Sequence, residues 1–329
     1  MRERSPLDPE AVWKEKDLSS GKAAETMVAI MRTSGCRWFK TGGCTMCGYN
    51  NASMQQIAEA ELMVQLDKIM GRYDGEPFVK IYTSGSFLDT EEIPVPVRER
   101  VFDEFSECER ILFESRPEFI TKEVLETIPK NVTIALGLES SNPQVLSRSV
   151  RKGFTPEDSK RAGKMIKDAG LSVRTYLLLK PLYLTESQAI EDTVASAMFA
   201  DEYSDEISIN PINVQRRTQV ESLWKRGEFR PPWLWSLIEV FKRLHGKVDA
   251  RLMSSPSGGG SNRGVHNCGE CDRGILDAIE RYSLSQNPKD LEVKCKCNDN
   301  WKDYLMAEKM LGTSADIERG IINDLVIGK

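Results

Sequence analysis

Three cysteines close to the N-terminus are the residues of this chain whose types and spacing point most clearly to chemistry. Cys36, Cys44 and Cys47 follow the pattern CX7CX2C. Three thiolates can bind three irons of a 4Fe–4S cluster and leave the fourth iron open to a substrate or cofactor. A structural zinc site built on the CX2C pair is the alternative. The cysteines follow an apolar run at residues 27–31, which indicates a first strand. Because the carboxyl ends of barrel strands carry active sites, this context favours an iron–sulfur cluster over a structural zinc site.

A second group of four cysteines lies near the C-terminus. Cys268 and Cys271 form a CX2C pair, and Cys295 and Cys297 form a CXC pair. Four cysteines in two pairs suit a structural zinc site, for which His266 is a substitute ligand. A second iron–sulfur cluster is the other interpretation, and the frequency of closed four-cysteine sites favours zinc.

The composition limits the class of protein. The chain has 329 residues, of which 40% are hydrophobic and 29% are charged, and no apolar stretch is long enough to cross a membrane. The N-terminus has no apolar signal segment, so we expect a cytoplasmic protein without a membrane partner. In such a reducing compartment, grouped cysteines bind metals. Only two histidines are present, so an enzyme of this sequence must draw its power from a cofactor.

The net charge of -5 argues against a uniformly basic nucleic-acid binder. Basic residues nevertheless gather at 148–174 and at 216–230. Each group alone is typical of solvated helix faces, whereas the two together are compatible with a phosphate-binding rim.

Apolar runs and amphipathic stretches alternate from about residue 27 to residue 245. This alternation predicts parallel βαβ units, and hence a barrel or an open doubly wound sheet. The expected strands are 28–31, 78–83, 110–113, 132–138, 172–179 and 206–211, and the expected helices are 54–72, 94–106, 121–127, 142–149, 155–169 and 185–202.

Polar residues follow several of these strands. They are Ser84, Gly85 and Ser86 after the second strand, Glu114 and Arg116 after the third, Glu139 after the fourth, and Arg151 after the next short helix. Each is weak evidence alone, because small-residue turns and exposed charges are common.

The order of these motifs along the chain is more specific. YTSGSFLD at 82–89, FESRPEFI at 113–120, LGLESSNPQVL at 136–146, VRKGFT at 150–155 and NPINVQRRTQVESLWKRGEF at 210–229 follow the cysteines. This series resembles the radical S-adenosylmethionine (SAM) superfamily, and within it the tRNA-modifying branch that includes the catalytic subunit of Elongator.

The resemblance implies an α/β fold, an incomplete parallel (β/α)6 barrel over residues 27–245. It leaves an N-terminal extension at 1–26 and a cysteine-rich extension at 246–329. It also implies that Cys36, Cys44 and Cys47 bind the 4Fe–4S cluster, that residues 84–86 receive the amino group of SAM, and that Arg151 pairs with its carboxylate. Glu139 matches a nucleoside contact, and Glu114 and Arg116 lie on the adjacent strand end.

The wide first gap between the cysteines, ending in Cys47-Gly48-Tyr49, resembles the radical SAM subunit of archaeosine synthase. That family implies cleavage of a lysine C–N bond on a tRNA whose D-loop carries a lysine adduct of 7-cyano-7-deazaguanine, which leaves the amidine of archaeosine. It also implies an electron donor and a partner, the tRNA-guanine-transglycosylase-like subunit that attaches the lysine. Sulfur insertion, Elongator-like chemistry, porphyrinogen oxidation and a non-catalytic zinc-dependent tRNA adaptor are the alternatives.

Overall fold

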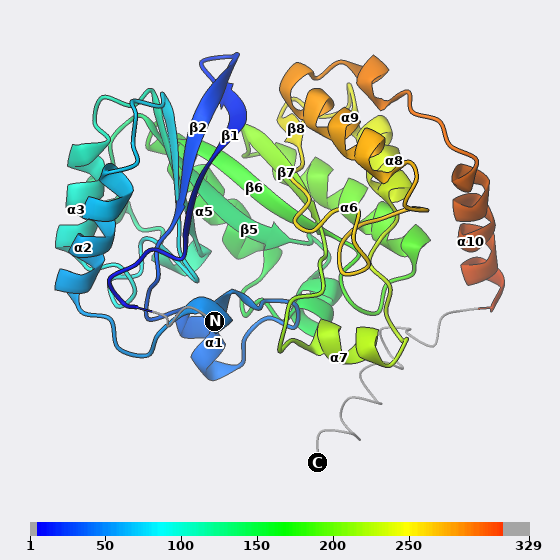
Figure 1. Ribbon diagram of the computed structural model, residues 1–329, viewed down its shortest axis with the longest axis horizontal. Coiled ribbons are helices and arrows are strands. Elements are labelled where there is room, and N and C mark those ends of the chain that lie inside the picture. Colours follow the sequence, from blue (N-terminus) through cyan, green and yellow to red (C-terminus); the bar gives the residue numbers. More distant parts are fainter. Residues whose placement is uncertain (1–4, 312–329) are drawn as a thin grey trace. The chain divides into compact units, whose positions relative to one another are not determined.

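The computed structural model describes residues 5–311, which form two compact units. The first unit comprises the chain up to residue 42 with residues 49–137 and 157–174, and the second comprises residues 43–48, residues 138–156 and the chain from residue 175. The strands are hydrogen-bonded in chain order, from β1 to β8. Figure 1 shows both units as sheet strands with helices packed outside them.

The first unit holds a parallel sheet with one antiparallel edge strand. Its strands are β1 (Ala11–Ser19), β2 (Lys22–Ile30), β3 (Phe78–Tyr82), β4 (Arg110–Ser115), most of β5 (Val132–Glu139) and the start of β6 (Ser172–Leu179). Strands β2 to β5 pair in parallel, and β1 pairs with β2 antiparallel. The helices are α1 (Arg37–Thr41), α2 (Glu59–Met70), α3 (Val95–Glu104), α4 (Lys122–Leu125) and α5 (Pro156–Asp168).

The second unit continues the α/β pattern and adds helices beyond the predicted barrel. It contains the end of β6, β7 (Glu206–Pro211) and the short β8 (Arg251–Met253), which pairs with β7 in parallel. Its helices are the π-helix Val145–Val150, α6 (Glu186–Asp201), α7 (Gln219–Lys225), α8 (Leu234–Leu244), α9 (Asp272–Ser285) and α10 (Cys297–Leu311).

The predicted α/β class is confirmed, and the predicted strands and helices are found with small shifts at their ends. The strand expected at 28–31 begins earlier, at Lys22, and β1 is an additional strand that the apolar pattern does not indicate. The remaining cysteine, Cys108, is buried in the turn between α3 and β4. The predicted division of the chain at residues 26 and 245 stays a prediction. None of the described helices is both long and apolar enough to span a membrane.

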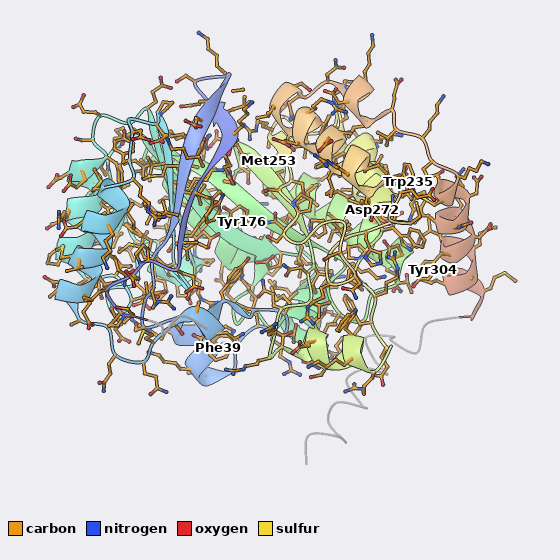
Figure 2. The ribbon with its side chains drawn as sticks, in the orientation of Figure 1. Phe39, Tyr176, Trp235, Met253, Asp272 and Tyr304 are labelled. Atoms are coloured by element: carbon orange, nitrogen blue, oxygen red, sulfur yellow. The ribbon has the colours of Figure 1, made fainter. Side chains whose placement is uncertain are left out.

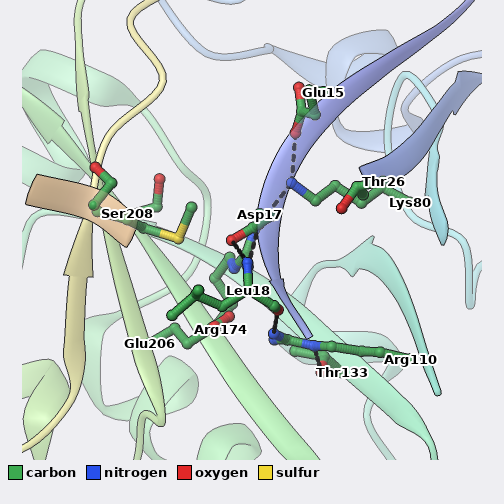
Figure 3. A network of polar contacts seen from close by, with 12 residues as sticks. Glu15, Asp17, Leu18, Thr26, Lys80, Arg110, Thr133, Arg174, Glu206 and Ser208 are labelled. Carbon is green, nitrogen blue, oxygen red and sulfur yellow. Dashed lines mark hydrogen bonds and ion pairs between the residues drawn. The ribbon is translucent and has the colours of Figure 1, made fainter. Parts of the chain in front are cut away.

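Buried charged residues explain why the apolar pattern of the sequence does not predict β1. Asp17 is 1% exposed, and its carboxylate pairs with the Nζ of Lys80 at 2.7 Å and with the guanidinium of Arg174 at 2.9 Å (Figure 3). Lys80 also pairs with Glu15 at 2.5 Å. The charged face of β1 therefore lies against buried cations on β3 and β6, where the sequence alone suggests a solvent-exposed segment.

Candidate active site and metal centre

The cysteine segment that follows β2 begins in the first unit. Cys36 is half-buried and immediately precedes the short helix α1, none of whose residues is buried. Cys44 and Cys47 belong to the second unit, where the backbone N–H of Cys47 donates to the carbonyl of Cys44 at 3.3 Å. None of the three is in a disulfide and all are partly exposed, so their sulfurs are accessible to a metal.

In the first unit, the loop after β3 lies directly against Cys36. A Cβ atom on Gly85 would come within 2.6 Å of the Cα of Cys36 and 2.4 Å of a Glu92 carboxylate oxygen, so only glycine fits here. The next strand end joins the same group, because the N–H of Arg116 donates to the hydroxyl of Ser86 at 3.1 Å, and the N–H of Phe87 donates to the carbonyl of Glu114 at 2.9 Å. The structure thus brings Cys36, residues 84–86 and the end of β4 together.

In the second unit, the turn that holds Cys44 and Cys47 is fixed beside Arg151. The Thr45 hydroxyl donates to the Ser149 carbonyl at 2.6 Å, and the Thr45 N–H donates to the Val150 carbonyl at 3.1 Å. Arg151 itself ends the π-helix with a left-handed φ of 58°. A ligand bound by Arg151 would therefore lie close to the two-cysteine turn.

Glu139, at the end of β5, has a left-handed φ of 70° and pairs with the Nζ of Lys152 at 2.8 Å. The next residue, Ser140, donates to Asp192 on α6 at 2.9 Å, and burial raises the pKa of the Asp192 carboxyl to about 6. Such a rare backbone conformation at the end of a strand is typical of functional sites. Lys152 directly follows Arg151 in the chain. Its ion pair therefore holds the Glu139 side chain near the backbone that carries Arg151, the other predicted contact residue.

Glu92 is a site residue that the sequence did not single out. It is 2% exposed, and it accepts hydrogen bonds from the Thr33 hydroxyl at 2.6 Å, the Ser84 N–H at 3.1 Å and the Ser86 N–H at 2.6 Å. Burial raises the pKa of its carboxyl, while the bonds from Thr33 and Ser86 act in the opposite direction. Glu92 therefore joins the segment before Cys36 to the loop after β3.

We expect Glu92→Gln to weaken SAM binding about 10- to 100-fold. Both carboxylate oxygens accept hydrogen bonds, so the amide NH2 of glutamine must face a donor and leave it unpaired, at a cost of about 1–3 kcal/mol. Equilibrium dialysis with labelled SAM measures the effect. Glu91→Gln is the matched control, because Glu91 is exposed and pairs only with the side chain of Arg37. Equal affinity of the two variants would contradict a role for Glu92 in this loop.

The four C-terminal cysteines come together in the second unit. Their sulfurs all lie within 4.8 Å of one another. The Sγ atoms of Cys271 and Cys297 are 3.5 Å apart, and Cys268 lies 3.6 Å from Cys271 and 3.9 Å from Cys295. His266 is not in this group, and its Nδ1 lies 2.7 Å from the Gly264 carbonyl.

This sulfur spacing distinguishes a single ion from a cluster. Four thiolates on one tetrahedral zinc, with bonds of about 2.3 Å, lie about 3.8 Å apart. In a 4Fe–4S cluster each thiolate binds a different iron, which separates the sulfurs much further. The donor set therefore fits one tetrahedral ion.

Polar donors around the four cysteines complete this metal centre. The indole N–H of Trp235 on α8 donates to Cys297 at 3.2 Å, and the side-chain amide of Asn267 donates to Cys271 at 3.5 Å. The backbone of Asn267 in turn donates to Asp272 at the start of α9, and Figure 2 shows Trp235 and Asp272 in this part of the second unit. Such donors orient and stabilise thiolate ligands. The centre joins the first residues of α9 and α10 to α8.

Comparison with known proteins gives close relatives over nearly the whole chain. The archaeosine synthase subunit beta of Methanosarcina acetivorans is 41% identical over 314 residues, which span 92% of this chain and 91% of that protein. The archaeosine synthase subunit beta of Thermococcus kodakarensis is 37% identical over 316 residues, which span 91% and 97%. No family model matches the chain. Among solved structures, a queuine lyase from Clostridium spiroforme bound to SAM and queuine aligns with a TM-score of 0.49 and 18% identity, over 65% of this chain and 87% of that one.

Proposed function

This chain belongs to the family of archaeosine synthase beta subunits, and from this premise we propose that it is a radical SAM enzyme of tRNA modification. Its substrate would be the lysine adduct of 7-cyano-7-deazaguanine in the tRNA D-loop. Cleavage of the bond between the lysine carbon and the amidine nitrogen would leave archaeosine. The observation that carries the proposal is 41% identity along both proteins, together with the CX7CX2C pattern of Cys36, Cys44 and Cys47, which resembles this family.

Cys36, Cys44 and Cys47 would hold the 4Fe–4S cluster in this proposal. When bound, the cluster supplies the electron for reductive cleavage of SAM to a 5'-deoxyadenosyl radical. The loop at residues 84–86 would bind the SAM amino group, and Arg151 its carboxylate. Two contacts support this division of roles, since Gly85 lies against Cys36 and the Cys44–Cys47 turn is hydrogen-bonded to the residue before Arg151. Glu139, Glu114 and Arg116 would complete the wall of the ligand site.

An assay on lysine-adduct tRNA tests the proposed reaction. The RNA carries deuterium on the lysine carbon bonded to the amidine nitrogen, and the reconstituted enzyme receives SAM and a reductant without oxygen. We expect deuterated 5'-deoxyadenosine, because hydrogen abstraction at that carbon precedes C–N cleavage. Loss of one electron from the substrate radical to a one-electron acceptor, and addition of water to the oxidised carbon, would then break the C–N bond and give an aldehyde and the amidine. Label transfer from another carbon would rule out this mechanism, and SAM cleavage that requires a different RNA would rule out the substrate.

We also infer that the four C-terminal cysteines bind zinc. The sulfur spacing fits one tetrahedral ion, and closed four-cysteine sites of this kind are usually structural zinc sites. The inference separates this centre from the cluster chemistry, which would depend on the first three cysteines alone. The zinc would stabilise the segments before α9 and α10.

We expect one zinc ion per chain at this centre, and we expect Cys295→Ala to lose it. Removal of one of four ligands lowers zinc affinity by several kcal/mol and releases the packing of α10, so thermal stability should fall as well. Metal content by mass spectrometry and the thermal midpoint measure both effects. Cys44→Ala is the matched control, since it removes an expected cluster ligand and should keep its zinc. A wild-type protein without zinc, whose iron–sulfur absorbance falls in Cys295→Ala, would contradict this assignment.

The proposed reaction needs partners. Family membership supports a second subunit, the transglycosylase-like enzyme that attaches lysine to the base, as well as an electron donor and a cytoplasmic setting. Because the net charge is -5, we expect the partner subunit to provide much of the tRNA affinity. Salt-dependent tRNA binding by the isolated chain, as tight as by the pair, would contradict this expectation.

A further inference from the structure

A second polar group in the second unit is not used by the functions assigned so far. It lies where the segment between α7 and α8 meets α10 and the residues after β6. Its charged members are Arg230, Glu308 and Lys180, and its aromatic members are Phe229, Trp233 and Tyr304. Lys180 directly follows β6, so the group lies at the carboxyl end of that strand, the end at which such barrels bind their substrates.

Hydrogen bonds connect this group to the predicted SAM site within the same unit. The hydroxyl of Ser149 donates to the carbonyl of Leu182 at 2.6 Å, and the Ser149 carbonyl accepts from Thr45 in the Cys44–Cys47 turn. Ser149 also lies two residues before Arg151. The chain segment after Lys180 is therefore fixed to the element that carries the expected SAM contact.

Arg230 is a partly buried cation that forms no ion pair with a described carboxylate, although the charges of Glu186, Asp272 and Glu308 act on it. Its guanidinium lies 4.1 Å from the centre of the Trp233 ring, and it donates to the carbonyls of Pro231 at 2.7 Å and His266 at 3.0 Å. Among the described residues, no carboxylate lies within ion-pair distance of it, and burial lowers its pKa. These two bonds use two of its five N–H groups, so a bidentate acceptor can still bind.

Glu308 is the matching acidic residue. It accepts from the backbone N–H of Glu186 at 2.7 Å and lies beside Tyr304, and no described cation forms an ion pair with it. Lys180 lies close by, but its Nζ pairs with Glu186 at 2.6 Å. Glu186 also accepts from the backbone N–H of Trp233 and from the Ser236 hydroxyl, so its own carboxylate is fully engaged.

Aromatic rings hold the two unpaired charges in one place. The rings of Trp233 and Tyr304 lie 6.0 Å apart, and Figure 2 shows Tyr304 on α10. The indole N–H of Trp233 is buried and has no hydrogen-bond acceptor among the described residues. A buried donor of this kind calls for an acceptor that is supplied from elsewhere.

We propose that Arg230 binds the α-carboxylate and Glu308 binds the α-ammonium group of the lysine portion of the substrate. This inference rests on the proposed function and takes lysine to be attached through its side-chain nitrogen, which keeps its amino-acid end free. An amino acid carries one group of each charge, and this group of residues offers one unpaired partner for each. The buried indole N–H of Trp233 is a second donor for the α-carboxylate. The aliphatic part of lysine would pack against the aromatic rings.

Three RNA substrates test the proposal. One carries the lysine adduct, one the cadaverine adduct, which lacks the carboxylate, and one the 6-aminohexanoate adduct, which lacks the α-ammonium group. We expect the wild-type enzyme to prefer the lysine adduct in kcat/KM over each of the others by about 10²-fold, because each analogue leaves one buried charge unpaired. Arg230→Gln should lose most of its activity on the lysine adduct and none on the cadaverine adduct. Glu308→Gln should likewise lose most of its activity on the lysine adduct, but it should lose none on the 6-aminohexanoate adduct.

Arg243→Gln on α8 is the matched control, because Arg243 forms an exposed pair with Glu191, and it should leave all three rates unchanged. If Arg230→Gln and Glu308→Gln slow all three substrates equally, the residues are structural or contact RNA phosphates, and the inference is wrong while the proposed function stands. If the wild-type enzyme converts the lysine adduct no better than the analogues, the inference is also wrong. Absence of conversion of the lysine adduct by the wild-type enzyme would overturn the proposed function and this inference together.

Discussion

Cys44→Ala is expected to abolish reductive SAM cleavage, with 5'-deoxyadenosine formation falling by about 10³-fold or more. Loss of one of three thiolates leaves too few ligands to hold a cluster with one open iron. The loop itself should survive, because its position depends on Thr45, which is hydrogen-bonded to Ser149, Val150 and Gln219 through its side chain and backbone. The change therefore removes a ligand and leaves its support in place.

Anaerobic reconstitution, iron and sulfide analysis and the visible absorption spectrum measure the cluster, and chromatography measures 5'-deoxyadenosine. Cys108→Ala is the control, because Cys108 is buried against Tyr73 and lies outside both cysteine groups. A cluster spectrum and SAM cleavage that persist in Cys44→Ala would show that Cys44 is not a ligand. A wild-type protein with neither property would instead favour the non-catalytic zinc-dependent adaptor.

The sequence predicts most of the barrel because its strands are mostly apolar, with few polar or charged interruptions. Strands β3 to β7 are buried on both faces, so their composition alone marks them. Strand β1 has the sequence AVWKEKDLS, whose charged residues hide it from a search for apolar runs. Its Asp17 is buried because Lys80 and Arg174 lie opposite, and these partners are distant in the chain. A local pattern cannot show which charged residue will have a buried counter-charge.

The same limit applies to the candidate site. Residues 84–86 could be predicted because a small-residue turn after a strand is visible in the sequence. Glu92 could not, since Glu91 and Glu92 are chemically identical neighbours and only the fold buries one of them. The four C-terminal cysteines were predicted as metal ligands, but only the distances between their sulfurs show that the group fits one ion better than a cluster.

Asp17→Ala is expected to lower the free energy of unfolding by about 3 kcal/mol. The carboxylate is shared by two cations that are almost fully buried, Lys80 and Arg174, so its loss leaves excess positive charge in a region of low dielectric constant. The midpoint of urea unfolding measures the change. Lys68→Ala on α2 is the control, because its pair with Asp8 is exposed and contributes little.

A second substitution shows where this energy comes from. Lys80→Met in the Asp17→Ala background removes one of the two buried cations that have lost the Asp17 carboxylate, so we expect it to restore part of the lost stability, although Lys80→Met alone is destabilising. Such coupling would assign the cost to buried charge rather than to the small cavity left by the aspartate. Additive losses in the double variant would contradict this account. The loss in Asp17→Ala would then come from the cavity left by the aspartate and not from unbalanced buried charge.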